Sequence, residues 1–220
     1  MPLDPLSRKI RIVLAEKGLP TKLVEVRPWE DAALLAKHNP AMTAPVLIDE
    51  PPTGGEIAVS PAPVIAEYLE EAYVQPALLP ATSAGRAEAR RLSAWFDDKF
   101  DREVNDFLLR EAADKRICRP GRPDPERLRR GAEALVWHFD YLAWLLEQRR
   151  WLAGEKMCLA DITAAAHLSS IDYLDAAPWR DFPNVKDWYA RMKSRPSFRP
   201  LLEERIDGVA PPRDYANPDF

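Results

Sequence analysis

Hydrophobic residues in the first third of the chain recur in short stretches with alternating helical and strand-like spacing. Over residues 7–17, Ile10, Val13 and Leu14 share one helical face, and Gly18 followed by Leu19-Pro20 ends that helix. The same patterns predict further helices over residues 30–38 and 61–73 and strands over residues 21–26, 46–48 and 56–58. Strands that alternate with helices indicate an α/β unit.

Beyond residue 85 the spacing is helical throughout, with long amphipathic stretches over residues 85–117, 125–150, 159–174 and 184–193. Residues 75–84 are rich in Pro, Ala, Ser and Thr, as a linker would be. Three prolines lie between residue 205 and the last residue. We therefore expect an α+β domain over residues 1–74, a linker over 75–84, an all-helical domain over 85–204 and an extended tail over 205–220.

A proline stands directly before the apolar run 46–48. X-Pro is the peptide bond for which the cis form is cheap, so the Ala44-Pro45 bond is a candidate cis bond at the start of a strand. Such a turn presents backbone hydrogen-bonding groups to a ligand. Ser60 precedes Pro61 at the start of the next predicted helix, where it fits an N-cap. This arrangement indicates a thioredoxin-like first domain with a cleft for a thiol ligand.

Composition argues against several classes of protein. No apolar run approaches the roughly 20 residues that span a bilayer, and the chain does not open like a signal peptide, so we expect a cytoplasmic protein without membrane insertion. A net charge of −4 argues against a nucleic-acid binder. Cys118 and Cys158 lie far apart and the three histidines do not cluster, so we predict neither a disulfide framework nor a metal site.

The order of a small α/β unit, a proline-rich linker and a helical domain resembles the glutathione S-transferase family over nearly the whole chain. The residues that carry the resemblance are 43–47 (Thr-Ala-Pro-Val-Leu), the helix start at Ser60 with 67–69 (Glu-Tyr-Leu), 151–154 (Trp-Leu-Ala-Gly) and 159–165 (Leu-Ala-Asp-Ile-Thr-Ala-Ala). It implies the glutathione S-transferase fold and a structural role for Asp161, whose carboxylate would satisfy the first N–H groups of a buried helix. With Cys158 at the cap position, we expect a cap weaker by about 1 kcal/mol.

A closer resemblance is to the glutathione S-transferase-like proteins of the FzlA type, which are bacterial division factors that bind filaments of FtsZ. The matching residues are 27–30 (Arg-Pro-Trp-Glu), 95–96 and 99–100, 165–169, 172–174, 178–179, 193–200 and the Asp219-Phe220 terminus. The resemblance implies FtsZ as a partner and a homodimer formed through the family's usual interdomain surface. Arg27, Trp29, Asp219 and Phe220 are the expected partner-binding residues, since exposed aromatic residues and Arg are enriched at interfaces.

Glutathione chemistry in this family needs a hydroxyl or thiol at the start of the first helix. The resemblance places Asp4 at that position, where a carboxylate would raise the pKa of a ligand thiol. Ser7 remains a candidate donor to sulfur, although it is more often an N-cap. Asp4 and Ser7 are thus the catalytic candidates.

Ala44, Pro45, Val59 and Ser60 outline the expected ligand-binding cleft. The family usually has an acidic residue before the serine, to bind the ammonium group of glutathione, and Val59 cannot do this. Ser60 is either an acceptor for the glutathione carboxylate or an ordinary cap. The main expectation is a weakly catalytic or non-catalytic protein that requires no cofactor. The alternative is a glutathione-dependent transferase or reductase.

Two further expectations concern structure. Trp137, Phe139, Tyr141 and Trp144 have helical spacing and are predicted to pack in the core or between domains. Family members also carry an interior strand before the first helix, which is missing or truncated here. We therefore expect the native start to lie roughly 8 to 10 residues upstream, the length of a short strand.

Overall fold

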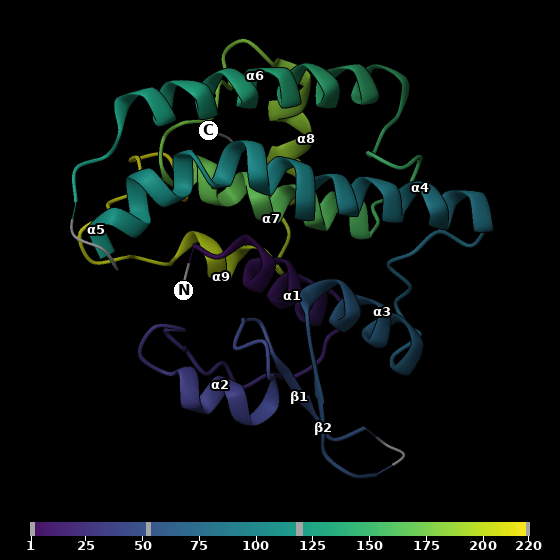
Figure 1. Cartoon of the computed structure of the whole chain (residues 1–220). Coiled ribbons are helices and arrows are strands. Elements are labelled where there is room, and N and C mark those ends of the chain that lie inside the picture. The colour runs from purple at the N-terminus through teal and green to yellow at the C-terminus, as the bar shows by residue number, and fades with distance from the viewer. Residues whose placement is uncertain (1–2, 52–53, 118–120, 219–220) are drawn as a thin grey trace.

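The computed structural model describes residues 3–51, 54–117 and 121–218, arranged as a small α/β layer below a larger helical domain (Figure 1). The first domain contains α1 (Pro5–Glu16), α2 (Ala32–His38), β1 (Leu47–Asp49), β2 (Ile57–Val59) and α3 (Ala62–Ala72). The second contains α4 (Ser83–Ala94), the π-helices η1 (Trp95–Asn105) and η2 (Arg110–Asp114), α5 (Lys115–Ile117), α6 (Pro125–Gln148), α7 (Leu159–Tyr173), α8 (Pro183–Lys193) and α9 (Arg199–Leu202). In the part of the chain that the structure describes, no helix has the length and apolar character needed to cross a bilayer.

The sheet of the first domain is smaller than predicted. β1 and β2 pair antiparallel, with Leu47 opposite Val59. Residues 21–26 were expected to form a strand, and that prediction is wrong: the segment is not assigned to a strand, and Leu23 and Val24 are 60% and 66% exposed. β-Branched residues favour a strand only where a neighbouring strand completes the hydrogen-bond ladder. Within the described residues, this segment has no strand beside it.

Two helix starts differ from the sequence-based prediction. The N-cap of α1 is Asp4, whose carboxylate accepts a hydrogen bond from the backbone N–H of Ser7 at 2.8 Å. Ser7 is therefore the capped residue and not the cap. At α3 the N-cap position is held by Pro61, without a side-chain hydrogen bond, so Ser60 is not the cap either. The Ala44-Pro45 bond is cis, as predicted.

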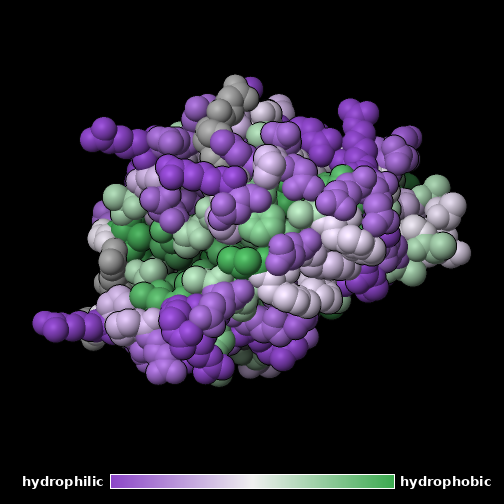
Figure 2. Space-filling view, turned by 90° about the horizontal axis from the view of Figure 1, so that it is seen from above, coloured by the Kyte–Doolittle hydropathy of each residue, from purple (hydrophilic) through white to green (hydrophobic). Residues whose placement is uncertain are grey.

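α7 lies at the centre of the molecule, and all of its side chains are buried. It packs against α1 of the first domain and against α4, η1 and α8 of the second. Small residues such as Ala164, Ala165 and Ala166 allow helices to approach on every side. The core is thus continuous from the first domain to the second. On the side of α6, hydrophilic residues cover most of the surface and hydrophobic residues gather in a band across its middle (Figure 2).

The long helix predicted over residues 85–117 is divided into shorter pieces. From Trp95 to Asn105 it has π-helical hydrogen bonding, and Phe96, Phe100 and Val104 are buried at a spacing of four residues. Residues four apart share one face of a helix. These three side chains therefore form one row against the core.

The C-terminal segment packs against the body of the protein, which the prediction of an extended tail did not anticipate. Tyr215 is buried, and its hydroxyl contacts Arg8 of α1 at 3.1 Å and the carbonyl of Leu201 at 3.2 Å. The hydroxyl of Tyr173 donates to the carbonyl of Val209 at 2.8 Å. Residues 203–218, which we call the C-terminal strap, are thereby tied to α1 and α7.

Candidate functional site

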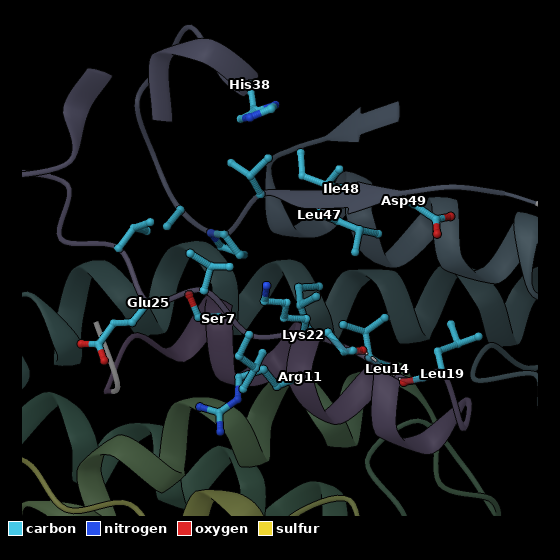
Figure 3. Close-up of a pocket in the computed structure, with 18 of the residues that line it drawn as sticks. Ser7, Arg11, Leu14, Leu19, Lys22, Glu25, His38, Leu47, Ile48 and Asp49 are labelled. Carbon is cyan, nitrogen blue, oxygen red and sulfur yellow. Dashed lines mark hydrogen bonds between the residues drawn. The ribbon is translucent and has the colours of Figure 1, made fainter. Parts of the chain in front are cut away.

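A cavity of about 1020 Å³ lies between α1, the unpaired segment 19–26, α2 and β1 (Figure 3). Its walls are mainly aliphatic, and Leu14, Leu35 and Leu47 are among the residues that line it. Ser7, Ala44 and Pro45 also line it, so three of the residues predicted for the ligand site meet at one place. Asp4, Val59 and Ser60 are not among its lining residues. The predicted cleft is therefore assembled only in part.

Several charged groups of the cavity are already engaged with other side chains. Arg11 forms an ion pair with Glu204, which comes from the C-terminal strap. Asp49 accepts hydrogen bonds from the hydroxyls of Tyr68 and Tyr73 at 2.5 and 2.9 Å. Burial and this contact with Asp49 raise the pKa of Tyr68 to about 12. Lys22 also lines the cavity, so an anionic ligand would meet this second cation beside Arg11.

The start of α1 is poorly suited to hold a thiolate. The Ser7 hydroxyl lies 2.5 Å from Oδ2 of Asp4, the same oxygen that caps the helix. Burial raises the pKa of the Asp4 carboxyl above its usual value, against the opposing effect of the hydrogen bonds from Ser7. The hydroxyl proton of Ser7 is thus directed at a carboxyl group instead of into the cavity. A carboxylate beside this site would also raise the pKa of a ligand thiol.

Trp29 is presented on the outside of the first domain by a compact turn. The backbone N–H groups of Glu30 and Asp31 donate to the carbonyl of Arg27 at 2.8 and 2.7 Å. The Asp31 carboxylate in turn accepts from the N–H of Arg27 at 2.7 Å. Trp29 is 47% exposed, and the Arg27 side chain is 56% exposed beside Glu30. The other two predicted partner-binding residues, Asp219 and Phe220, lie outside the described residues.

Asp161 has a structural position at the centre of the helical domain. Its carboxylate accepts hydrogen bonds at 2.9 Å from the backbone N–H groups of Leu152 and Cys158 and from Nε1 of Trp188. Cys158 is the N-cap of α7, in a capping box with Asp161. Burial and the neighbouring Asp161 carboxylate raise the pKa of the Cys158 thiol to about 12. With a pKa this high the thiol carries little of the thiolate, which is the nucleophilic form, at neutral pH.

Sequence reasoning missed a partly exposed group of aromatic residues, which we call the aromatic patch: the half-exposed Trp137 and Trp144 with the partly buried Trp95 and Tyr141. Trp137 and Trp144 are each 50% exposed, so the prediction that they lie in the core or between domains is wrong, although Phe139 is buried as expected. The buried face of α6 carries Leu135, Phe139, Leu142 and Leu145. Residues 137, 141 and 144 lie on another face of α6. The spacing of the aromatic residues alone does not show which of the two faces is buried.

Two histidines of the helical domain are satisfied within buried networks. Nε1 of Trp95 donates to Nδ1 of His138 at 3.1 Å, so the proton of this ring lies on Nε2, which donates to Glu103 at 3.1 Å. Burial lowers the pKa of His138 to about 4. His167 contacts Asp97 and Asn105 at 3.3 and 2.8 Å. In the described ranges, no cluster of three or more His, Cys, Asp or Glu side chains is arranged to hold a metal ion.

Comparison with known proteins matches both domains to one family. The family described as Glutathione S-transferase, N-terminal domain, matches residues 5–72, and Glutathione S-transferase, C-terminal domain, matches residues 123–196. FtsZ-localized protein A of Caulobacter vibrioides is 48% identical over 219 residues, which is 100% of this chain and 96% of that protein.

Solved structures give the same result. The structure of FzlA from C. crescentus superimposes with a TM-score of 0.96 at 48% identity, covering 100% of this chain and 97% of that one. A glutathione S-transferase from Rhodospirillum rubrum superimposes with a TM-score of 0.95 at 47% identity, with the same coverage. Two matching domains in the family's order and a relative of this identity along the full chain establish the lineage. The chain belongs to the glutathione S-transferase family.

Proposed function

We propose that this protein is a weakly catalytic or non-catalytic glutathione S-transferase-like protein that binds FtsZ filaments during bacterial cell division. The observation that carries the proposal is the full-length similarity to FtsZ-localized protein A, at 48% identity. The exposed Trp29 and the Arg27 side chain on their compact turn supply an aromatic and cationic surface of the kind that dominates binding energy at interfaces.

The start of α1 supports the weak or absent catalysis in this proposal. A transferase of this family activates glutathione by holding its sulfur as a thiolate beside a hydroxyl or thiol donor. Here the Ser7 hydroxyl is directed at Asp4, and the cation Arg11 is paired with Glu204. A thiolate at this position would meet a carboxyl group without a free hydroxyl donor, so it would gain little stabilisation.

Two further parts of the proposal concern assembly and location. We propose that the protein acts as a homodimer in the cytoplasm, where FtsZ filaments would be accessible to it. The glutathione S-transferase architecture supports the dimer, because dimers are common in this fold.

Co-sedimentation with polymerised FtsZ tests the filament binding. Wild type is expected in the pellet with polymer and in the supernatant without it. Trp29→Ala and Asp219→Lys are each expected to weaken pelleting roughly tenfold or more, the size of effect expected for an interface anchor. Val74→Ala is the matched control, because Val74 is also an exposed hydrophobic residue of the first domain. Wild type that stays in the supernatant at every polymer concentration would contradict the proposal.

A second function is favoured by one observation: Ala44 and Pro45 line a large cavity that also contains the cation Lys22. This arrangement suits a carboxylate-bearing ligand such as glutathione, so the alternative is a glutathione-dependent transferase or reductase. Titration calorimetry separates the two functions. Our proposal predicts glutathione binding no tighter than about 1 mM, the weak end of the usual affinity range. Sub-millimolar binding together with conjugation of an electrophile would favour the enzyme.

A further inference from the structure

Glu204, near the start of the C-terminal strap, forms ion pairs with two arginines of α1, which lies beside α9 in Figure 1. Its Oε2 is 2.7 Å from Nη2 of Arg8, and its Oε1 contacts Arg11. The Arg8 side chain has no exposed surface, whereas those of Arg11 and Glu204 are 21% and 18% exposed. The strap is thus attached to α1 by one carboxylate that two cations share.

Arg8 also holds the strap at a second point. Its Nη1 donates to the hydroxyl of Ser169 at 2.8 Å and lies 3.1 Å from the hydroxyl of Tyr215. Tyr215 is buried, with its ring centroid 5.1 Å from that of Tyr173. A guanidinium can serve several partners at once, because it presents five N–H donors in a fixed plane. One side chain of α1 therefore anchors the strap near both of its ends.

Burial strengthens this attachment. Attraction between opposite charges grows as water is excluded, and Arg8 is fully buried. Burial alone would lower the pKa of Arg8, but Tyr215 and Glu204 outweigh it and raise the pKa above its usual value. Arg8 therefore stays charged. A strap that moved away would leave a buried cation without the Glu204 carboxylate, which is costly.

The anchor at Tyr215 limits the reach of the end of the chain. Asp219 follows Tyr215 by four residues, and an extended chain spans at most about 3.6 Å per residue, so this tether reaches roughly 14 Å. Without the anchors of the strap, the tether would begin at Leu202, the last residue of α9 and seventeen residues before Asp219. The effective concentration of a tethered group falls roughly as the −3/2 power of tether length, so it would fall about ninefold.

We propose that the C-terminal strap is a tether that holds the end of the chain close enough for Asp219 and Phe220 to bind the FtsZ filament together with Trp29. This inference deepens the proposed function and rests on it. Trp29 lies on a turn of the first domain, and the strap is fixed to α1 of the same domain. Two linked contacts bind more tightly than either contact alone, provided that the tether is short enough to keep them together.

The test is pelleting with FtsZ polymer, measured as a double-mutant cycle between Tyr215→Ala and Asp219→Lys in the full chain. Tyr215→Ala alone is expected to raise the FtsZ concentration for half-maximal pelleting roughly ninefold, the factor given by the longer tether. In the Asp219→Lys background it should change that concentration less than about twofold, because the contact that the tether presents is already lost. A role in folding alone would give the same factor in both backgrounds.

Glu204→Gln is the second variant, for use also if Tyr215→Ala does not fold. It keeps the Tyr215 ring but leaves Arg8 without the Glu204 charge, so it is expected to weaken pelleting in the same direction and only while Asp219 is present. Glu203→Gln is the matched control, because Glu203 is the exposed neighbour of Glu204, and it is expected to pellet as wild type does. Circular dichroism and thermal melting establish that each variant is folded.

The outcomes separate the tether from the proposed function. Equal weakening with and without Asp219→Lys, or no weakening by either folded variant, would overturn the tether and leave filament binding standing. Pelleting that Asp219→Lys leaves unchanged would overturn it as well, because the end of the chain would not be a contact. Wild-type protein that does not pellet with polymer would overturn both.

Discussion

Asp4 stands where the family resemblance predicts a hydroxyl or thiol. Its contacts show that its side chain caps α1. It caps α1 through the N–H of Ser7 and lies 2.5 Å from the Ser7 hydroxyl. The observed role of Asp4 is therefore to cap the helix. Asp161 has the corresponding role in the second domain, where it is fully buried and satisfies two backbone groups and one indole.

Replacement of Asp161 by Ala is expected to destabilise the protein by at least about 3 kcal/mol, because three buried donors would lose their acceptor at about 1 kcal/mol or more each. Asp161→Asn keeps one acceptor oxygen and should cost less. Urea unfolding measures both free energies. A loss below about 1 kcal/mol for the alanine variant would mean that water or another group replaces the carboxylate.

His138 predicts a pH dependence of stability. Its pKa is lowered to about 4 in the folded protein, mainly by burial, and is about 6.5 in an unfolded chain. Between these values the unfolded state binds more protons, so stability falls as the pH falls from 6.5 towards 4. From pH 7 to pH 5 the expected loss is about 2 kcal/mol from this residue.

The matched variant is His138→Gln, which has no charge to gain over this range and should therefore show a pH dependence smaller by about that amount. Denaturant unfolding at both pH values gives the difference. Since the other two histidines are present in both proteins, they cancel in the comparison. Equal pH dependence in the two proteins would mean that the His138 ring titrates at its ordinary pKa.

At the scale of elements, hydrophobic spacing predicted the helices better than the sheet. α1, α3, α6, α7 and α8 begin and end within two residues of their predicted limits. Four of them, α1, α3, α6 and α8, have an amphipathic repeat and a proline in the first turn, whereas the start of α7 is marked by the Cys158–Asp161 capping box. The strand predicted over residues 21–26 was wrong, because a strand needs a neighbouring strand to pair with, and the local sequence does not show whether there is one. η1 failed because the choice between α- and π-helical hydrogen bonding depends on how Phe96, Phe100 and Val104 pack.

The C-terminal strap is an element that sequence did not reveal, since its contacts join residues nearly two hundred positions apart. Arg8 is buried between Ser169, Tyr215 and Glu204, so the strap is anchored by one aromatic and one ionic contact. Glu204 also reaches Arg11 on the wall of the cavity. The strap thereby connects the cavity with the end of the chain.

Tyr215→Ala is expected to release the strap, because its ring packs 5.1 Å from Tyr173 and its truncation leaves a large void. Limited trypsin digestion followed by mass spectrometry should detect faster cleavage after Arg205 and Arg213 by roughly tenfold or more, as a loss above about 1.4 kcal/mol in local stability implies. Tyr215→Phe keeps the ring and should be cleaved nearly as slowly as wild type. Equal cleavage rates for the alanine variant and wild type would show that the strap is held by other contacts.

At the scale of the whole molecule, the fold and the family were predictable from ordered motifs such as Thr43–Leu47 and Trp151–Gly154. The ligand cleft was predictable only in part: Ser7, Ala44 and Pro45 meet at the cavity, whereas Val59 and Ser60 do not line it. Which residues face a cavity depends on the packing of distant elements, here α1, α2 and β1. The exposure of the aromatic patch was missed for the same reason.

In our proposal, a transferase-like fold serves filament binding instead of glutathione chemistry. The most direct test is the pelleting of wild-type protein over a concentration series of FtsZ, once polymerised and once kept unpolymerised. We expect saturable pelleting with polymer, which is lost in the Trp29→Ala variant and retained in Val74→Ala. Wild-type protein that remains in the supernatant with polymer, or pelleting that Trp29→Ala leaves unchanged, would contradict it.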